Sequence, residues 1–146
     1  MTANDYFMIN RPSDTLVFHC VDHRFQEAFR KYIFKELSID VYNPVVIAGG
    51  AYAICNDGDK NYEYIWDQID FFIEKGGIKR LILINHEDCK WYGKENPNLE
   101  SSDLKEKGKF DLLRAANKVK VKYPGVEVIS VWAELSGESI RFHKID

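Results

Sequence analysis

Short apolar runs alternate along the chain with segments in which apolar residues recur every three or four positions. The runs are rich in Val, Ile, Leu and Phe and end in turn-forming residues, which is typical of β-strands. They predict strands over residues 15–20, 44–48, 80–85, 126–133 and 139–143. The segments with helical spacing predict helices over residues 25–37, 62–73 and 112–123.

The order of these elements predicts the fold class. Strand runs without polar alternation are usually buried on both faces, as in a parallel sheet covered by helices. The βαβαβ order favours the same answer. We therefore expect one α/β domain over residues 1–146, with a mainly parallel central sheet flanked by helices. In such sheets ligands bind beyond the carboxyl ends of the strands.

Composition and charge exclude several functions. The 146 residues, 45% hydrophobic and 29% charged, suit a soluble protein with a single core. A net charge of -3 gives no electrostatic reason to expect a nucleic-acid partner. No membrane partner is expected either, because the longest near-apolar stretch, residues 45–55, is shorter than the roughly 20 residues that cross a bilayer.

The first residues and the cysteine count indicate the compartment. Residues 1–14 have neither the basic nor the apolar segment of a secretory signal. Three cysteines are an odd number and too few for a disulfide scaffold. We therefore expect a cytoplasmic protein whose thiols are free to bind metal.

Two motifs place metal-binding residue types at the ends of predicted strands. Residues 20–24 (CVDHR) close the first strand, and residues 86–89 (HEDC) follow the third. Because the carboxyl ends of parallel strands lie at one edge of a sheet, we expect Cys20, His86 and Cys89 to meet. Two thiols and one imidazole form the ligand set of a catalytic zinc site with an open fourth position.

Other chemistries fit these residues less well. A cysteine phosphatase needs five residues between its Cys and Arg, whereas three separate Cys20 from Arg24. The AGGA turn after the second strand lacks the G-x-G-x-x-G pattern of a dinucleotide site. A nucleophilic pair of Cys20 and His86 stays open, although it leaves Cys89 without a role. Cys55 lies in a polar turn and is expected to be an incidental thiol.

At these motifs the chain resembles the β-class carbonic anhydrases. That family has C-x-D-x-R at the end of its first strand and H-x-x-C after its third. The resemblance extends to the AGG turn and to residues 131–140 (VWAELSGESI), which look like the closing hairpin of the family. It implies a β-carbonic-anhydrase-like domain and a zinc lyase of the carbonate dehydratase type, which reversibly hydrates carbon dioxide to bicarbonate.

The resemblance implies a role for each residue of the motifs. Cys20, His86 and Cys89 would ligate Zn²⁺, with water or hydroxide in the fourth position. Asp22 would accept a hydrogen bond from that hydroxide and orient it towards carbon dioxide, and Arg24 would hold Asp22 by a charge-assisted pair. The alternative for these two residues is structural: Asp22 would cap a helix, and Arg24 would form a surface ion pair.

Two other functions stay open. One is hydrolysis of another small heterocumulene, carbonyl sulfide or carbon disulfide, on which relatives with the same metal ligands act. The other is a carbonic-anhydrase-like protein that binds zinc without catalysis. The chain departs from the family at His23, where Ser is common, at Lys90, where Gly is common, and at Val46-Ile47, where Arg-Asn often stands.

Assembly and proton transfer are predicted less directly. Only a short segment precedes the first strand, so the helical arm usual in the family is missing. We still expect a homodimer or higher homo-oligomer, because the family builds its active sites near subunit interfaces. Three histidines could shuttle protons: His19, His23 and His143. Four aromatic residues suit either a subunit interface or the core: Tyr6, Phe7, Trp91 and Tyr92.

Overall fold

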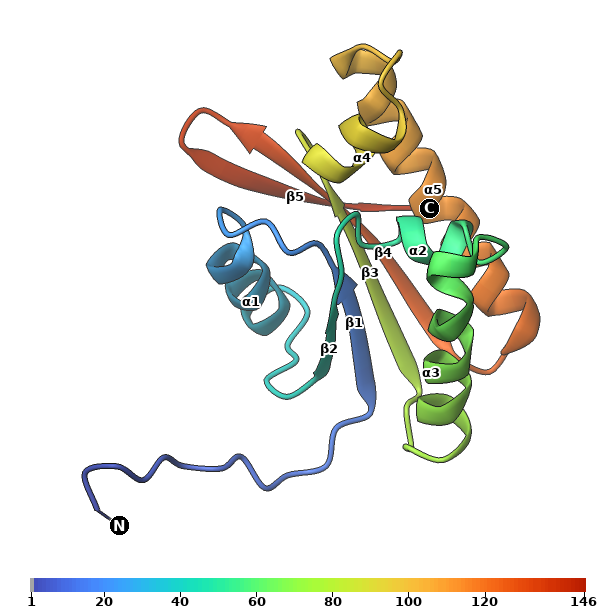
Figure 1. Cartoon of the computed structure of the whole chain (residues 1–146). Helices are drawn as coiled ribbons and strands as arrows, with labels where there is room; N and C mark the ends of the chain where they lie inside the picture. The colour runs from blue at the N-terminus through green and yellow to red at the C-terminus, as the bar shows by residue number, and fades with distance from the viewer. Residues whose placement is uncertain (1) are drawn as a thin grey trace.

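The computed structural model describes residues 2–146, which form an α/β domain around one five-stranded sheet (Figure 1). The strands are β1 (Thr15–His19), β2 (Asn43–Val46), β3 (Arg80–His86), β4 (Glu127–Ser136) and β5 (Ser139–Ile145). The helices are α1 (Gln26–Lys35), α2 (Tyr52–Cys55), the 3-10 turn η1 (Lys60–Tyr62), α3 (Glu63–Glu74), α4 (Lys90–Glu95) and α5 (Ser101–Lys122).

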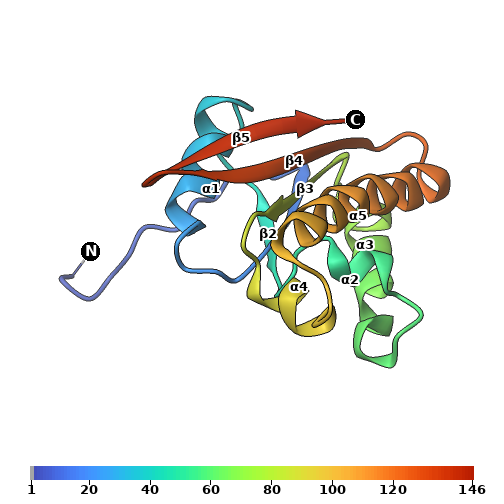
Figure 2. The ribbon, with the colours of Figure 1, turned by 90° about the horizontal axis from the view of Figure 1, so that it is seen from above.

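The sheet has the order β2-β1-β3-β4-β5, in which only β5 runs antiparallel to its neighbour. This confirms the predicted mainly parallel sheet. Helix α1 covers one face, and α3 and α5 cover the other (Figures 1 and 2). None of the helices in residues 2–146 is both long and apolar enough to cross a membrane.

Alternate residues of the central strands build two cores. Leu16 and Phe18 pack with α2, α3 and α5, whereas Val17 packs with α1 on the opposite face. The strand β1 is buried along its whole length because helices cover both faces, as its apolar sequence predicts. The edge strand β2 is only half-buried, and Val46 at its end is exposed.

The structure adds elements that the apolar pattern does not predict. The helices α2 and α4 span four and six residues, too short for an apolar stripe to repeat. Strand β4 runs to Ser136, beyond the predicted end, because it continues into the hairpin with β5. The short turn between them uses Gly137 at a φ of 62°, where glycine is favoured.

The turn after β2 needs glycine for two reasons. Gly49 and Gly50 have positive φ angles of 84° and 55°. A Cβ atom on Gly49 would lie 2.7 Å from Cδ1 of Trp91, and one on Gly50 would lie 2.7 Å from the carbonyl oxygen of Ile84. The turn is therefore packed directly against β3 and α4 at the carboxyl edge of the sheet.

The N-terminal segment, residues 2–14, runs away from the domain in an extended conformation (Figure 1). Arg11 pairs with Asp40 near the base of this segment. Beyond that pair, Tyr6 and Phe7 are 90% and 89% exposed, and Met8 and Ile9 are exposed as well. Four consecutive apolar side chains thus bury almost nothing within the chain itself.

Candidate metal centre

Cys20, His86 and Cys89 meet at the carboxyl edge of the sheet. Cys20 follows β1, His86 ends the adjacent strand β3, and Cys89 precedes α4. One ligand atom from each lies within 4.8 Å of the others, and the two sulfurs are 3.9 Å apart. Two sulfurs bound at about 2.3 Å to one tetrahedral zinc ion lie about 3.8 Å apart, so the spacing fits that ion.

The imidazole of His86 is in the tautomer that leaves Nε2 with a free lone pair for a metal ion. Its Nδ1 lies 2.7 Å from the carbonyl oxygen of Glu87, so Nδ1 carries the proton and donates it. The remaining nitrogen, Nε2, is buried and has no hydrogen-bond partner among the described residues. A buried polar atom without a partner is costly. A metal ion bound at Nε2 would satisfy it, and the bond from Nδ1 is the outer contact that metal-bound histidines commonly make.

The two thiols are buried, and their sulfurs lie 3.9 Å apart. The neighbouring Cys89 thiol lowers the pKa of Cys20, and Cys20 raises the pKa of Cys89, because both sulfurs cannot ionise side by side without a cation. The backbone N–H of Gly49 donates to Sγ of Cys20 at 3.5 Å and favours its thiolate. A divalent cation between the sulfurs would allow both to ionise.

Asp22 and Arg24 form an ion pair beside the three ligands. Nε of Arg24 lies 3.2 Å from both carboxylate oxygens of Asp22, and Nη2 lies 2.8 Å from Oδ2. The guanidinium lowers the pKa of Asp22 to about 2. Asp22 also accepts from the backbone N–H of Arg24, but it does not cap α1, which begins later at Gln26. The carboxylate is therefore ionised and held by Arg24.

Asp88 is a contact of this pair that the motif analysis missed. Nη1 of Arg24 lies 3.2 Å from Oδ2 of Asp88, and Nη2 lies 3.3 Å from its carbonyl oxygen. Asp88 has a φ of 59°, a left-handed conformation that Asp tolerates better than most residues. Arg24 thus joins the loop after β1 to the loop after β3. The acidic residue inside the second motif was the only sign of this contact in the sequence.

A cleft of about 720 Å³ opens on the side of the ligands that carries Asp22. His23, Arg24, Lys90 and Lys94 line it with Asp22, so basic groups outnumber acidic ones there. Lys94 lies over the ring of Trp91, 4.3 Å from its centre. A protein with a net charge of -3 thus presents a locally basic cleft beside its metal ligands.

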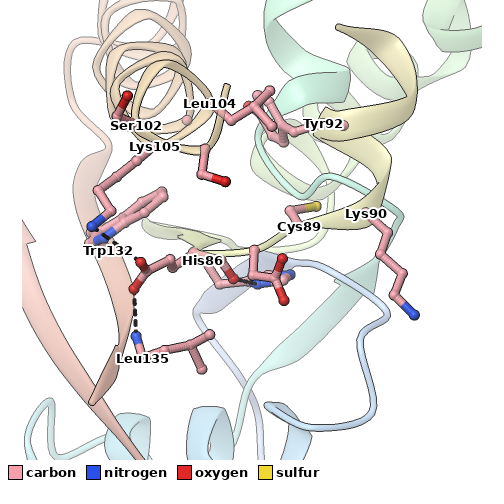
Figure 3. A pocket seen from close by; sticks show the side chains of 14 residues that line it. His86, Cys89, Lys90, Tyr92, Ser102, Leu104, Lys105, Trp132 and Leu135 are labelled. Atoms are coloured by element: carbon pink, nitrogen blue, oxygen red, sulfur yellow. Dashed lines mark hydrogen bonds and ion pairs between the residues drawn. The ribbon is translucent and has the colours of Figure 1, made fainter. Parts of the chain in front are cut away.

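A second cleft, of about 550 Å³, opens on the other side of His86 and Cys89 (Figure 3). Glu87 and Lys105 form an ion pair of 3.1 Å within it, and Glu87 also accepts from the backbone N–H of Leu135 at 2.9 Å. His86 and Cys89 line this cleft, whereas Cys20 lines the cleft with Asp22, so the cluster lies between the two.

The other candidate residues lie apart from the ligands or in other settings. Cys55 is buried at the end of α2 instead of lying in a polar turn, and its thiol donates to the carbonyl of Asp111 at 3.0 Å. Of the histidines, only His23 lines the cleft with Asp22. His19 is buried against Phe29, and His143 pairs with Glu134 at 2.8 Å.

The four aromatic candidates differ in burial. Tyr92 is buried, and Trp91 packs between the cleft and the hydroxyl of Tyr62, to which its indole N–H donates at 3.1 Å. Tyr6 and Phe7 stay exposed in the N-terminal segment. Core packing therefore accounts for Tyr92, whereas the exposed Tyr6 and Phe7 are not core residues.

Comparison with known proteins gives the family of the chain. Residues 12–144 match the family described as "Putative carbonic anhydrase". The chain belongs to this family. An uncharacterized protein of Rickettsia conorii is 26% identical to it, over 98% of this chain and 79% of its own length.

Solved carbonic anhydrases share the fold. The enzyme of Streptococcus mutans superposes with a TM-score of 0.59 at 10% identity, over 97% of this chain and 87% of its own. A tetrameric β-carbonic anhydrase of Sordaria macrospora superposes with a TM-score of 0.54 at 13% identity, over 92% and 83%. The sequence resemblance to β-class carbonic anhydrases is thereby confirmed, and so is the predicted fold class.

Proposed function

We propose that the chain is a zinc enzyme that reversibly hydrates carbon dioxide to bicarbonate. The observation that carries the proposal is the cluster of Cys20, His86 and Cys89 with its unpartnered His86 Nε2, next to a cleft that both Cys20 and the arginine-held Asp22 line. When bound there, zinc would lower the pKa of a water molecule in its fourth position to near neutrality and so supply a nucleophile.

The chain itself would orient and restrain the reacting groups. Asp22, ionised and held by Arg24, would accept the hydrogen bond of the attacking water and direct a lone pair towards carbon dioxide. Arg24 occupies both oxygens of Asp22, and this would keep the carboxylate from taking the fourth metal position. The basic groups of the cleft, Lys90 and Lys94, would favour the anionic product bicarbonate.

Hydrolysis of carbonyl sulfide or carbon disulfide is the second candidate. Val21, Ala48 and Trp91 supply apolar surface in the same cleft, which suits these less polar molecules. Stopped-flow assays of zinc-loaded protein with each of the three substrates separate the candidates. Carbon dioxide should be turned over fastest. Turnover of a sulfur substrate alone would replace the proposal, and turnover of none would favour a non-catalytic zinc protein.

The proposal requires reduced thiols and is consistent with a cytoplasmic protein. Cys20 and Cys89 can bind zinc only as free thiolates, and all three cysteines are free in the structure. A reducing compartment keeps such thiols available.

We further propose that the chain forms a homodimer through its N-terminal segment. Contiguous exposed apolar side chains mark interaction sites, and Tyr6 to Ile9 form such a stretch. Light scattering of the wild type should give twice the 17.0 kDa mass of one chain. The double variant Phe7→Ser/Met8→Ser loses two apolar side chains from the proposed interface. Its dimer dissociation constant should therefore rise about tenfold or more.

A matched control distinguishes this segment from other exposed aromatics. Phe71 on α3 is also exposed, and Phe71→Ser should leave the mass unchanged. A wild type that is monomeric at micromolar and higher concentrations would contradict the dimer. Equal dissociation of Phe71→Ser and the double variant would contradict the role of the N-terminal segment.

A further inference from the structure

A single buried amide lies beneath the metal ligands. Asn85 precedes the ligand His86 and is only 2% exposed. Its Nδ2 donates to the hydroxyl of Tyr92 at 3.0 Å and to the carbonyl of Gly108 at 2.9 Å. Its Oδ1 accepts from the backbone N–H of Ala51 at 2.9 Å. Both donors and the acceptor are therefore used, and the partners lie on three other segments of the chain.

Two of these three segments touch a metal ligand or carry one. Ala51 follows the glycine turn whose Gly49 N–H donates to Sγ of Cys20. Tyr92 lies on α4, the helix that begins directly after Cys89. It packs in a small buried cluster with Cys20 and Cys89. A shift of Asn85 would therefore be transmitted to the surroundings of all three ligand side chains.

The network continues to a buried carboxylate. The hydroxyl of Tyr92 donates to Oδ2 of Asp111 at 2.9 Å, and the side chain of Asp111 is fully buried. Lys107 and Arg114 lie 3.3 Å and 3.5 Å from its oxygens and offset its charge. The orientation of Tyr92 is thus fixed at one end by Asp111 and at the other by Asn85.

The space around Asn85 is also tight. A Cβ atom on Gly50 would lie 2.9 Å from Oδ1 of Asn85, so the glycine turn approaches the amide closely. Close packing of this kind leaves few alternative positions for the loop that donates to Cys20. The amide also fixes the spacing between this turn and α4, because it bonds to both.

We propose that Asn85 is a positioning residue for the metal centre, whose amide sets the relative placement of the loops carrying Cys20, His86 and Cys89. This inference rests on the proposed zinc site but not on the reaction assigned to it. Outer contacts of metal ligands change metal affinity by roughly ten- to a hundredfold when they are removed. A residue with a purely structural role would instead change the stability of the fold and leave metal affinity unchanged.

The test compares zinc affinity in four proteins by competition with a chromophoric chelator. Asn85→Leu keeps the side chain near its size but removes all three hydrogen bonds, and it should weaken zinc binding about ten- to a hundredfold. Tyr92→Phe removes the hydroxyl and with it two hydrogen bonds, of which the one to Asn85 should matter for the metal loops, and its loss should weaken zinc binding about two- to tenfold. Thr15→Val, at the opposite end of β1 from Cys20, should lower stability and leave zinc affinity at the wild-type value.

Two further readouts complete the experiment. The absorption spectrum of cobalt-substituted protein reports ligand geometry and should change in Asn85→Leu but not in Thr15→Val. Circular dichroism of the metal-free variants reports folding, and if Asn85→Leu fails to fold, Tyr92→Phe carries the test. Unchanged zinc affinity and an unchanged cobalt spectrum in the folded Asn85 and Tyr92 variants would overturn the inference.

Failure of the proposed function gives a different pattern of results. A wild type that binds one zinc ion but hydrates no carbon dioxide would contradict the reaction, while the affinity comparison would still decide the role of Asn85. A wild type that binds no zinc would contradict the metal centre itself and this inference with it.

Discussion

Purified protein should hold about one zinc ion per chain, and Cys20→Ser or Cys89→Ser should remove most of it. Each substitution replaces a thiolate by a hydroxyl, which binds zinc poorly, and leaves two of three protein ligands at the site. His86→Ala should also lose most of the zinc, because it removes the unpartnered Nε2 that would bind the metal. Elemental analysis of the purified proteins measures the effect directly.

Cys55→Ser is the matched control for these substitutions. Its thiol is buried like the others but donates to Asp111 and lies outside the ligand cluster. A serine hydroxyl can make the same donation, so this variant should keep the zinc content of the wild type. Full zinc in both Cys20→Ser and Cys89→Ser would be incompatible with the proposed centre.

Asp22→Asn should lower turnover by roughly ten- to a thousandfold while zinc content stays near the wild-type value. The amide keeps the size of the side chain but replaces one acceptor oxygen by a donor, so the attacking water loses its orientation. The substitution also removes the charge that pairs with Arg24. Hydration rates measured beside zinc content separate this effect from loss of metal.

Arg24→Ala should also lower activity, but by freeing the carboxylate of Asp22 instead of removing it. Without the guanidinium, both oxygens of Asp22 lose their partner, and Asp22 becomes free to approach the metal. The loss of activity should be greatest below neutral pH, where less of the metal-bound water is ionised and the nucleophile is scarcer. Unaltered activity in both Asp22→Asn and Arg24→Ala would show that this pair has no part in the reaction.

The ligand set was predictable because it depends on topology. Apolar runs that end at Cys20 and Asn85 predict parallel strands of one sheet, whose carboxyl ends share one edge, and the structure makes these two strands neighbours. The motif spacing then brings Cys89 back towards the same edge. Neither step requires knowledge of long-range side-chain contacts.

The support beneath the ligands could not be predicted in this way. In the sequence, Asn85 is simply the polar residue at the end of an apolar strand. Its hydrogen-bond partners lie on other segments of the chain: Ala51, Tyr92 and Gly108. The helix α4, which orients Tyr92, is too short to show an apolar period. Contacts of this kind depend on how close the packed elements come to one another, which local sequence patterns do not encode.

The exposed positions show a similar limit. The run at residues 44–48 predicts a buried strand, but β2 lies at the edge of the sheet and leaves Val46 exposed. The apolar residues from Tyr6 to Ile9 lie in a segment that leaves all four side chains more than half exposed in its own chain. A run of apolar residues indicates that burial is favourable, but the surface that provides the burial depends on the strand order and on assembly.

The most direct test of the account is carbon dioxide hydration by zinc-loaded wild type, measured by stopped flow from about pH 6 to about pH 9 with zinc quantified in the same samples. Metal-free protein and Cys89→Ser serve as blanks, since both lack the complete centre. We expect a rate above background that rises with pH through the neutral range, as a metal-bound water becomes ionised. Protein that holds one zinc ion per chain and shows no hydration above background at any of these pH values would contradict the proposed function.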